Sequence, residues 1–459
     1  MQVASYNVDV EGRSGILKAS KTSKAFTFAG EPGLLPNGRR MRVAIVASSY
    51  NYIRDGVALT LNRLVEHLEK AGVEVRVFTP VNKKKQAFQH HGQIVPVPSI
   101  PLPGRSDYRL AFSLPQAEIE AFKPDIIHVA LAPDWLGYST LRMARRLGVP
   151  LVASYHTCYE KYLEYYGVAN LFTRLLKNYL SSYYATCKEV YVPTQSMIDE
   201  LRQGGQHDNF ILWQRGVDAD LFNPAQRSQA WRESLGIGPD EVVVLFVSRL
   251  VREKQLATLA GVFTRLKEQG VPFRGLVVGD GPERQMLEQA CPDTIFTGTL
   301  QGEELARAYA SGDIFVFPSD TETFGNVTLE AMAAGLPCVC ASAPGSQSLV
   351  VDGETGFLAT PRDADSFTTY VKRLLEDPEL RHRMGLAARE RSLSLSWSVP
   401  MEMLLNRYRK LVDGTEACKL PMFRPFTPRR AGAHEPTQRP SSAQRQGWAL
   451  SWWCLHLAL

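Results

Sequence analysis

The chain has 459 residues, 44% of them apolar and 22% charged, with a formal net charge of +5. This length predicts two to four domains, and the ordinary composition excludes collagen-like, coiled-coil and wholly disordered proteins. No run of 18 apolar residues is present, so no membrane-spanning helix is predicted. Seven cysteines without framework spacing argue against a disulfide scaffold and favour a reducing, cytoplasmic location.

The positive charge lies in two terminal extensions. Residues 1–40 hold six basic and three acidic residues and residues 415–459 hold six and two, which leaves a net −2 for residues 41–414. Both extensions are rich in Gly, Pro, Ser and Thr, so we expect them to be disordered. The nearly neutral central part gives no support for nucleic-acid binding. No apolar signal segment opens the chain, and Asp9 and Glu11 argue against a transit peptide, although organelle targeting stays open.

The first half of the central part alternates between strands and helices. A β-branched run at residues 42–47 is typical of a buried parallel strand. Apolar residues then recur at helical spacing from Leu59 to Leu68, and Gly72 ends that helix. We therefore predict one doubly wound domain over residues 41–222. Its further strands are predicted at 73–78, 94–97, 125–129, 150–154, 189–192 and 210–213, with a long helical segment at 168–187.

The pattern restarts after a polar, proline-containing stretch at residues 223–240, which predicts a linker. A second doubly wound domain is predicted over 241–396, and a final helix within 397–414 is placed to cross back to the first domain. Two such domains would face each other across a cleft, the expected ligand site. Strands are predicted at 242–247, 275–278, 294–297, 314–317 and 338–341, and helices at 255–269, 283–289, 302–310 and 326–334. On the last strand, Cys338 and Cys340 are expected to face opposite ways.

The segment Glu322–Pro337 follows a predicted strand and opens a helix. Free backbone N–H groups at the helix start, together with the helix dipole, suit a phosphate. Glu330 lies about one turn further on, where a carboxylate could bind ribose hydroxyls. The alternative, two solvated carboxylates, is disfavoured by the surrounding Phe, Gly, Asn and Pro residues. The candidate ligand-binding residues of this segment are Glu322, Phe324, Gly325, Asn326, Val327 and Glu330.

Two basic residues, Arg249 and Lys254, leave the carboxyl end of another predicted strand, where cations can meet a diphosphate. Such residues are usually only solvated, but their place in the same domain as Glu322 favours a pyrophosphate clamp. A nearby turn begins at Gly279 and is not the dinucleotide fingerprint, because Gly281 is followed by Pro and Glu. Turn geometry is the simpler explanation of Gly279, and backbone packing near a nucleobase is the alternative.

These features resemble the large retaining glycosyltransferase family four over about residues 41–414. The paired Glu322 and Glu330, Arg249 with Lys254, and the Gly-Asp-Gly-Pro turn carry the resemblance. It implies an α/β GT-B fold, with two Rossmann-like domains facing across a cleft, and sugar transfer from a nucleotide-diphosphate sugar without a metal or cofactor. It also implies that Glu322 contacts the donor sugar, Glu330 the ribose, and the two cations the diphosphate. The glutamate segment is most similar to members acting on membrane glycolipids, including sulfoquinovosyl- and mannosyltransferases.

The first domain should supply the acceptor side. The predicted strand 150–154 ends before Tyr155 and His156, and the family places a His here beside the donor sugar and acceptor. A single His at a strand end is otherwise more often structural. Family members often carry Gly-Gly in the first strand-to-helix loop, which here reads Asp55-Gly56. Gly56 can still let the backbone approach the diphosphate, whereas Asp55 leaves that approach in doubt and could instead bind the acceptor.

The segment 159–188 is rich in Tyr, Leu, Arg and Lys, and Lys83–Lys85 adds a basic loop. This composition suits an anionic membrane face, and the alternative is a core-facing helix with lysines reaching solvent. The favoured function is transfer from a UDP- or GDP-sugar to a lipid or glycolipid, in the cytoplasm or at the cytosolic face of a membrane. The alternatives are a soluble saccharide synthase of the same family and a catalytically silent nucleotide-sugar-binding subunit.

Overall fold

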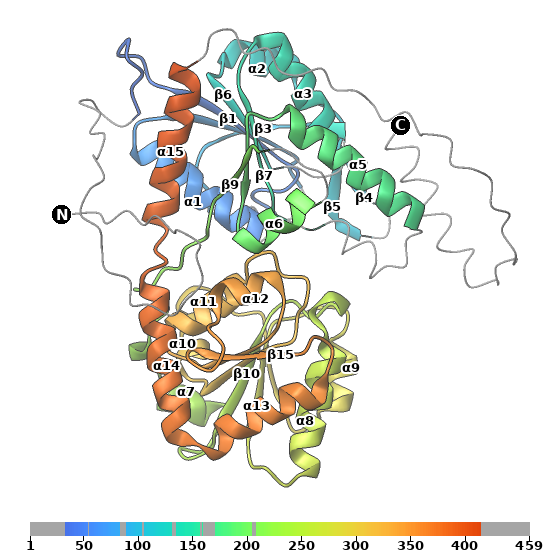
Figure 1. The fold of residues 1–459 in the computed structure, drawn as a ribbon, viewed down its shortest axis with the longest axis vertical. Coiled ribbons are helices and arrows are strands. Elements are labelled where there is room, and N and C mark those ends of the chain that lie inside the picture. The colour runs from blue at the N-terminus through green and yellow to red at the C-terminus, as the bar shows by residue number, and fades with distance from the viewer. Residues whose placement is uncertain are drawn as a thin grey trace, which may run out of the picture.

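A computed structural model describes residues 33–414, apart from 54, 83–88, 103–104, 131–134, 157, 159–169 and 204–207. It contains two parallel sheets, each covered by helices, in two domains stacked end to end (Figure 1). The sheet of the first domain has the order β3-β2-β1-β6-β7-β8-β9. Its strands are β1 (Arg42–Ala47), β2 (Glu74–Thr79), β3 (Gln93–Pro96), β6 (Ile126–Ala130), β7 (Leu151–Ser154), β8 (Glu189–Val192) and β9 (Phe210–Leu212).

The sheet of the second domain has the order β12-β11-β10-β13-β14-β15. In each sheet the strand order reverses beside the first strand, at β1 with β6 and at β10 with β13, and such switch points are where open α/β sheets bind ligands. The expected pair of doubly wound domains is therefore confirmed. The strands are β10 (Val243–Val247), β11 (Arg274–Val278), β12 (Ile295–Gly298), β13 (Ile314–Phe317), β14 (Cys338–Ala341) and β15 (Gly356–Ala359).

The helices follow the strands in the order typical of parallel sheets. The first domain contains α1 (Gly56–Lys70), α2 (Gln116–Phe122), α3 (Trp135–Leu147), α5 (Asn170–Thr186) and α6 (Gln195–Gln203). The second contains α8 (Leu256–Glu268), α9 (Arg284–Ala290), α10 (Gly302–Ala310), α11 (Asn326–Ala333), α12 (Pro344–Leu349), α13 (Ala364–Glu376) and α14 (Pro378–Leu393), with a short 3₁₀ turn, η2 (Arg252–Lys254).

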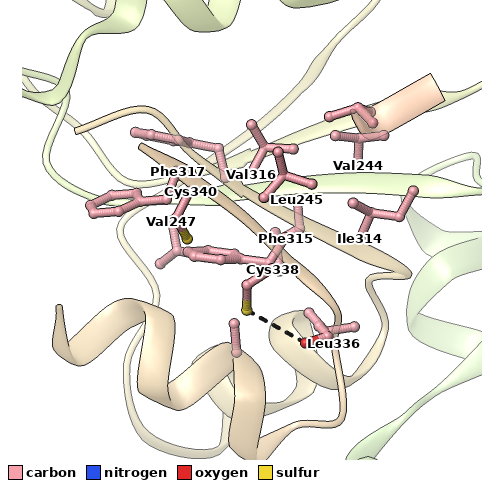
Figure 2. Packing of buried hydrophobic residues seen from close by; sticks show 14 of the residues in the cluster. Val244, Leu245, Val247, Ile314, Phe315, Val316, Phe317, Leu336, Cys338 and Cys340 are labelled. Carbon is pink, nitrogen blue, oxygen red and sulfur yellow. Dashed lines mark hydrogen bonds between the residues drawn. The ribbon is translucent and has the colours of Figure 1, made fainter. Parts of the chain in front are cut away.

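The core of the second domain is built on β10, β13 and β14 (Figure 2). Phe315 and Phe317 are fully buried, and their rings stack with centroids 5.8 Å apart. The expectation that Cys338 and Cys340 face opposite ways is wrong, because residues two apart on a strand share a face. Both are fully buried, and both sulfurs lie near Thr328 of α11, at 3.9 Å from its carbonyl oxygen and 3.8 Å from its hydroxyl.

The last helix within residues 33–414, α15 (Ser398–Asp413), packs on the first domain beside α1, although it follows the second domain in the chain (Figure 1). Its apolar face is buried with β1 and α1 in one core cluster. The Trp213 indole N–H donates to the carbonyl of Pro400 at 3.2 Å, which ties the helix to the end of β9. The buried residues of this face are Met401, Leu404, Leu405 and Tyr408.

Two stretches were predicted to lie outside the domains, one before residue 41 and one at residues 223–240. In the structure both contact the domains. Leu35 is buried, and Arg39 donates two hydrogen bonds to Asp125 at 2.6 and 3.0 Å, so the first domain begins several residues before Met41. Within the expected linker, α7 (Gln229–Ser234) carries Arg232, which is fully buried and donates to Asp313 at 3.1 Å. Both stretches contain charged residues and glycines, a composition typical of exposed segments, so the sequence did not predict either contact.

Within the part of the chain that the structure describes, the backbone passes between the domains twice, and the two passages lie side by side. Val217 pairs with Ser396 in a parallel bridge, and its N–H donates to the carbonyl of Leu395 at 2.9 Å. A Cβ added at Gly216 would lie 2.3 Å from the backbone nitrogen of Trp397, so only glycine permits this approach.

A candidate active site at the domain junction

The start of α1 faces the second domain. Asp55 caps this helix, because its carboxylate accepts the Ala58 N–H at 2.9 Å. Burial raises the pKa of Asp55, although the Ala58 N–H and the charge of Arg249 oppose that shift. A Cβ added at Gly56 would lie 3.2 Å from the side-chain nitrogen of Asn326. The N-termini of α1 and α11 therefore meet at the junction, and the sequence motif Asp55-Gly56 has a capping role there.

The loop from Ser319 to Gly325 joins β13 to α11, and we name it the donor loop after the contact with the donor sugar that the family resemblance predicts for Glu322. Gly325 has a φ of +97°, a conformation that favours glycine, and it places the first N–H groups of α11 at the loop's end. Phe324 is buried in the core of the second domain. Val327 is partly buried and packs against the same core, so these two side chains anchor the loop. A Cβ added at Gly345 of α12 would lie 2.7 Å from the Glu322 carbonyl oxygen, so α12 fixes the loop from the other side.

Two of the predicted site residues, Lys254 and Glu322, form an ion pair at this loop. The Ser319 hydroxyl donates a second hydrogen bond to the same carboxylate oxygen at 3.1 Å. Burial acts to raise the pKa of Glu322, but the charge and hydrogen bond of Lys254, with help from Ser319 and Arg249, hold it below its usual value. Arg249 lies nearby, with a guanidinium nitrogen 3.9 Å from Glu253. The site therefore holds an ionised carboxylate that is paired with Lys254 and further stabilised by the charge of Arg249.

Glu330 lies one turn into α11, the helix that follows the donor loop. Its carboxylate accepts the hydroxyl of Tyr309 at 2.9 Å. Burial raises the pKa of Glu330 to about 7, although the Tyr309 hydrogen bond opposes the shift. The two predicted glutamates thus differ in charge near neutral pH, since Glu322 is ionised and Glu330 is partly protonated.

The turn at Gly279 packs directly against the loop that carries Arg249. A Cβ added at Gly279, where φ is +136°, would lie 1.8 Å from the Ser248 carbonyl oxygen. A Cβ at Gly281 would lie 2.4 Å from the Leu250 carbonyl oxygen. Both glycines are thus required by backbone contact, and this geometry accounts for Gly279 without a nucleobase.

His156 follows β7, and its backbone, not its ring, contacts the second domain. Its carbonyl oxygen accepts the Thr323 hydroxyl of the donor loop at 2.9 Å, while its ring nitrogens contact Ser154 at 2.7 Å and Arg215 at 2.8 Å. Burial and the charge of Arg215 lower the pKa of His156 well below its usual value. Tyr155, expected on the acceptor side, lies instead in the core, with its ring 6.1 Å from that of Tyr184.

Sequence reasoning missed three residues that complete this arrangement, namely Arg215, Ser319 and Thr323. Arg215 is 4% exposed and stacks over the Trp213 ring at 4.5 Å. A basic residue in Gln-Arg-Gly-Val-Asp, just after a predicted strand, was the available signal for it. Ser319 and Thr323 had no comparable signal, because hydroxyl residues are common in loops. Among the residues described, no three His, Cys, Asp or Glu side chains are grouped to hold a metal ion.

The predicted membrane face is only partly described. Lys83–Lys85 and residues 159–169 lie outside the described residues. In α5 the core-facing alternative holds for Leu176, Leu180, Tyr183 and Tyr184, which are buried. Arg174, Leu175 and Lys177 are exposed on the same helix. Within the described ranges, no helix combines the length and apolarity needed to cross a membrane.

Comparison with known proteins identifies the family. A model described as Glycosyltransferase Family 4 matches residues 54–221, and one described as Glycosyl transferases group 1 matches residues 227–391. The sulfoquinovosyl transferase SQD2 of Arabidopsis thaliana is 35% identical over 387 residues, covering 82% of this chain and 74% of the relative. The chain belongs to glycosyltransferase family 4. The resemblance seen in the glutamate segment is thereby confirmed.

Further relatives of this glycosyltransferase differ in the sugar that their names give. A GDP-mannose-dependent alpha-mannosyltransferase of Corynebacterium glutamicum is 34% identical, over 84% of this chain and 93% of the relative. An alpha-monoglucosyldiacylglycerol synthase of Acholeplasma laidlawii is 25% identical, over 74% of this chain and 89% of the relative. The fold matches that of sucrose-phosphate synthase from Thermosynechococcus elongatus with a TM-score of 0.69 at 22% identity, over 82% of this chain and 100% of that structure. The predicted GT-B architecture is thereby confirmed.

Proposed function

We propose that this glycosyltransferase moves a sugar from a UDP- or GDP-sugar to a membrane lipid or glycolipid, with retention of the anomeric configuration. One observation carries the proposal: Lys254 and Glu322 form an ion pair beside Arg249, near the N-terminus of α11. Two cations and a helix N-terminus supply the positive potential that a diphosphate requires.

Donor binding would exchange the partners within this site. The diphosphate would take Lys254 and Arg249, and Glu322, released from Lys254, would face the sugar. The bond between the anomeric carbon and the diphosphate oxygen then breaks, and the two cations with the α11 N–H groups stabilise the departing charge without requiring a metal. On the same face of the sugar the acceptor oxygen bonds to the anomeric carbon, and its proton passes to the leaving phosphate oxygen, so no protein nucleophile is needed. His156 would contribute position and not proton transfer, since both its ring nitrogens contact protein groups.

The lipid acceptor is supported by the exposed part of α5 and by the relatives. Arg174 and Lys177 flank the exposed Leu175, a mixture of basic and apolar groups that suits an anionic lipid surface. One relative's name gives a diacylglycerol product. The same face supports peripheral contact with a membrane.

A donor screen with two matched variants tests the proposal. UDP-, GDP- and ADP-sugars are each added to the full-length protein, and the melting temperature is recorded, because a ligand that binds only the folded state raises it. We expect one class of donor to stabilise the wild type and Arg252→Ala but not Lys254→Ala. Arg252 is the control because it lies in the same η2 turn and its exposed side chain pairs with Glu283 at 3.1 Å.

Transfer is then measured with the stabilising donor on diacylglycerol in anionic vesicles and on soluble saccharides. Sugar transferred to the lipid supports the proposed acceptor, and transfer only to the saccharides contradicts it. Donor binding without any turnover would favour the silent subunit. If no nucleotide-sugar raised the melting temperature, the assignment of the junction to the donor would be wrong.

The raised pKa of Glu330 predicts that donor affinity depends on pH. The ionised carboxylate accepts hydrogen bonds from two ribose hydroxyls, whereas the protonated group accepts fewer, so affinity should increase as the pH rises through about 7. We expect a nucleotide-sugar to bind about tenfold more tightly at pH 8 than at pH 6, since that is the change in the ionised fraction. Calorimetry on the wild type and on Glu330→Gln measures this, and the variant should bind weakly and equally at both pH values. A nucleotide-sugar is used because its diphosphate has no group that titrates near neutrality.

A further inference from the structure

A buried chain of hydrogen bonds leads from the C-terminal helix to the domain junction. The Tyr408 hydroxyl on α15 contacts Nδ1 of His128 on β6, and Nε2 of His128 lies 2.8 Å from the Ser154 hydroxyl on β7. Ser154 in turn lies 2.7 Å from Nε2 of His156, whose Nδ1 lies 2.8 Å from the Arg215 guanidinium. Tyr408, His128 and Ser154 are fully buried. We call these five residues the relay.

The chemistry of the side chains gives the relay one direction. A guanidinium only donates, so Nδ1 of His156 accepts and the ring proton lies on Nε2. That proton is donated to Ser154. Among the described residues the Ser154 hydroxyl has no other acceptor than Nε2 of His128, so it donates there. The proton of His128 therefore lies on Nδ1 and is donated to the Tyr408 oxygen. The two histidines thus hold opposite tautomers. Both are neutral, since burial and the charge of Arg215 lower their pKa values, to about 3 for His128.

The hydrogen bonds of the relay cannot all be reversed, because Arg215 fixes the donor at the His156 end. If every donor turned round, Nε2 of His156 would have to accept from Ser154 while Nδ1 still accepted from Arg215. A neutral imidazole cannot accept at both nitrogens, because one of them carries the proton. Arg215 remains a donor at neutral pH, although burial lowers its pKa to about 9. The His156 ring is thus held in one orientation and one protonation state.

The relay meets the donor loop at Thr323. The backbone carbonyl of His156 accepts from Thr323, the residue after Glu322, so the orientation of His156 sets a contact between the two domains. We propose that Tyr408, His128, Ser154 and Arg215 are positioning residues for sugar transfer, which hold His156 so that its carbonyl meets the donor loop. This inference rests on the proposed transfer activity. It gives α15, from the far end of the chain, a role in the geometry of the site.

A pair of tyrosine variants separates positioning from simple stability. Tyr408→Phe removes the relay's terminal hydroxyl but keeps the ring. Tyr191→Phe is the control, because Tyr191 is fully buried in the same aromatic cluster, 6.4 Å from Tyr408, and its hydroxyl donates to Glu189 outside the relay. We expect Tyr408→Phe to lower kcat roughly 3- to 10-fold with the donor KM unchanged, since small misplacements of reacting groups cost turnover. Tyr191→Phe should keep the wild-type kcat even if both variants lose similar melting temperature.

The tautomers provide a readout that does not depend on activity. Long-range ¹H–¹⁵N spectra of histidine-labelled protein should show one proton on Nε2 of His156 and one on Nδ1 of His128. Tyr408→Phe should introduce a second tautomer at His128, because the Nδ1 proton loses its acceptor, and Ser154→Ala should do the same, because Nε2 loses its donor. His156 should keep its proton on Nε2 in both variants, since Arg215 still donates to Nδ1, and Tyr191→Phe should change neither ring. Wild-type tautomers in both relay variants, or equal loss of kcat in Tyr408→Phe and Tyr191→Phe, would overturn the inference. A wild-type enzyme without turnover but with the expected tautomers would instead refute the proposed function alone.

Discussion

Glu322→Gln should lower kcat by about 10²–10³-fold while leaving donor affinity within a few-fold of the wild type. The amide keeps the size of the side chain but removes the charge that Lys254 and Ser319 hold in the ionised form. If Glu322 meets the sugar most strongly in the transition state, its loss appears in turnover and not in binding. Steady-state kinetics with the preferred donor, together with calorimetric donor affinity, measure the two effects separately.

The matched control for this variant is Glu283→Gln. Glu283 is also a carboxylate of the second domain paired with a basic residue, Arg252 at 3.1 Å, but it lies outside the donor loop. Its neutralisation should leave kcat unchanged. Equal kinetics for Glu322→Gln and the wild type would remove the donor loop from the mechanism.

The second large effect is on stability, and it concerns α15. Leu404→Ala should destabilise the first domain by about 2–5 kcal/mol, because Leu404 is fully buried between α15 and the sheet and its truncation leaves a cavity. For a domain of this size the melting temperature should fall by roughly 5–15 °C. Val399→Ala on the same helix is the control, since Val399 is 59% exposed and its truncation should change little. Scanning calorimetry on both variants measures the difference. Equal melting of the two would show that α15 contributes no packing to the first domain.

The sequence predicted the parts of the molecule that depend on local pattern. The buried strands β1, β10 and β13 were found within about a residue of their ends, because each is an uninterrupted apolar or β-branched run. The edge strand β15 was missed, since Gly356–Ala359 is too short to show a period. The hairpin of β4 (Ser99–Leu102) and β5 (Arg105–Ala111) was missed as well, because Pro101 disrupts the strand pattern.

Some residues of the candidate site could likewise be predicted from local sequence patterns, and others could not. Glu322 and Lys254 could be named because each stands in a recognisable motif beside a strand, and the structure brings them together across 68 positions of sequence. The relay could not be predicted, because His128 and Tyr408 are 280 positions apart and no local period connects them. Phe324 and Tyr155 were taken for ligand-facing residues, yet both are buried, since an aromatic residue next to a loop satisfies a core as well as a ligand.

The paired passages between the domains have a mechanical consequence. Because residues 216–218 and 395–397 are bound to each other, the two domains share a single pivot instead of two separate tethers. Opening for donor entry would therefore be a rotation about that pivot, which would separate contacts between the domains such as Ser196 with Pro344. A side chain at Gly216 would force the two passages apart, and the rotation between the domains would then no longer have one fixed axis.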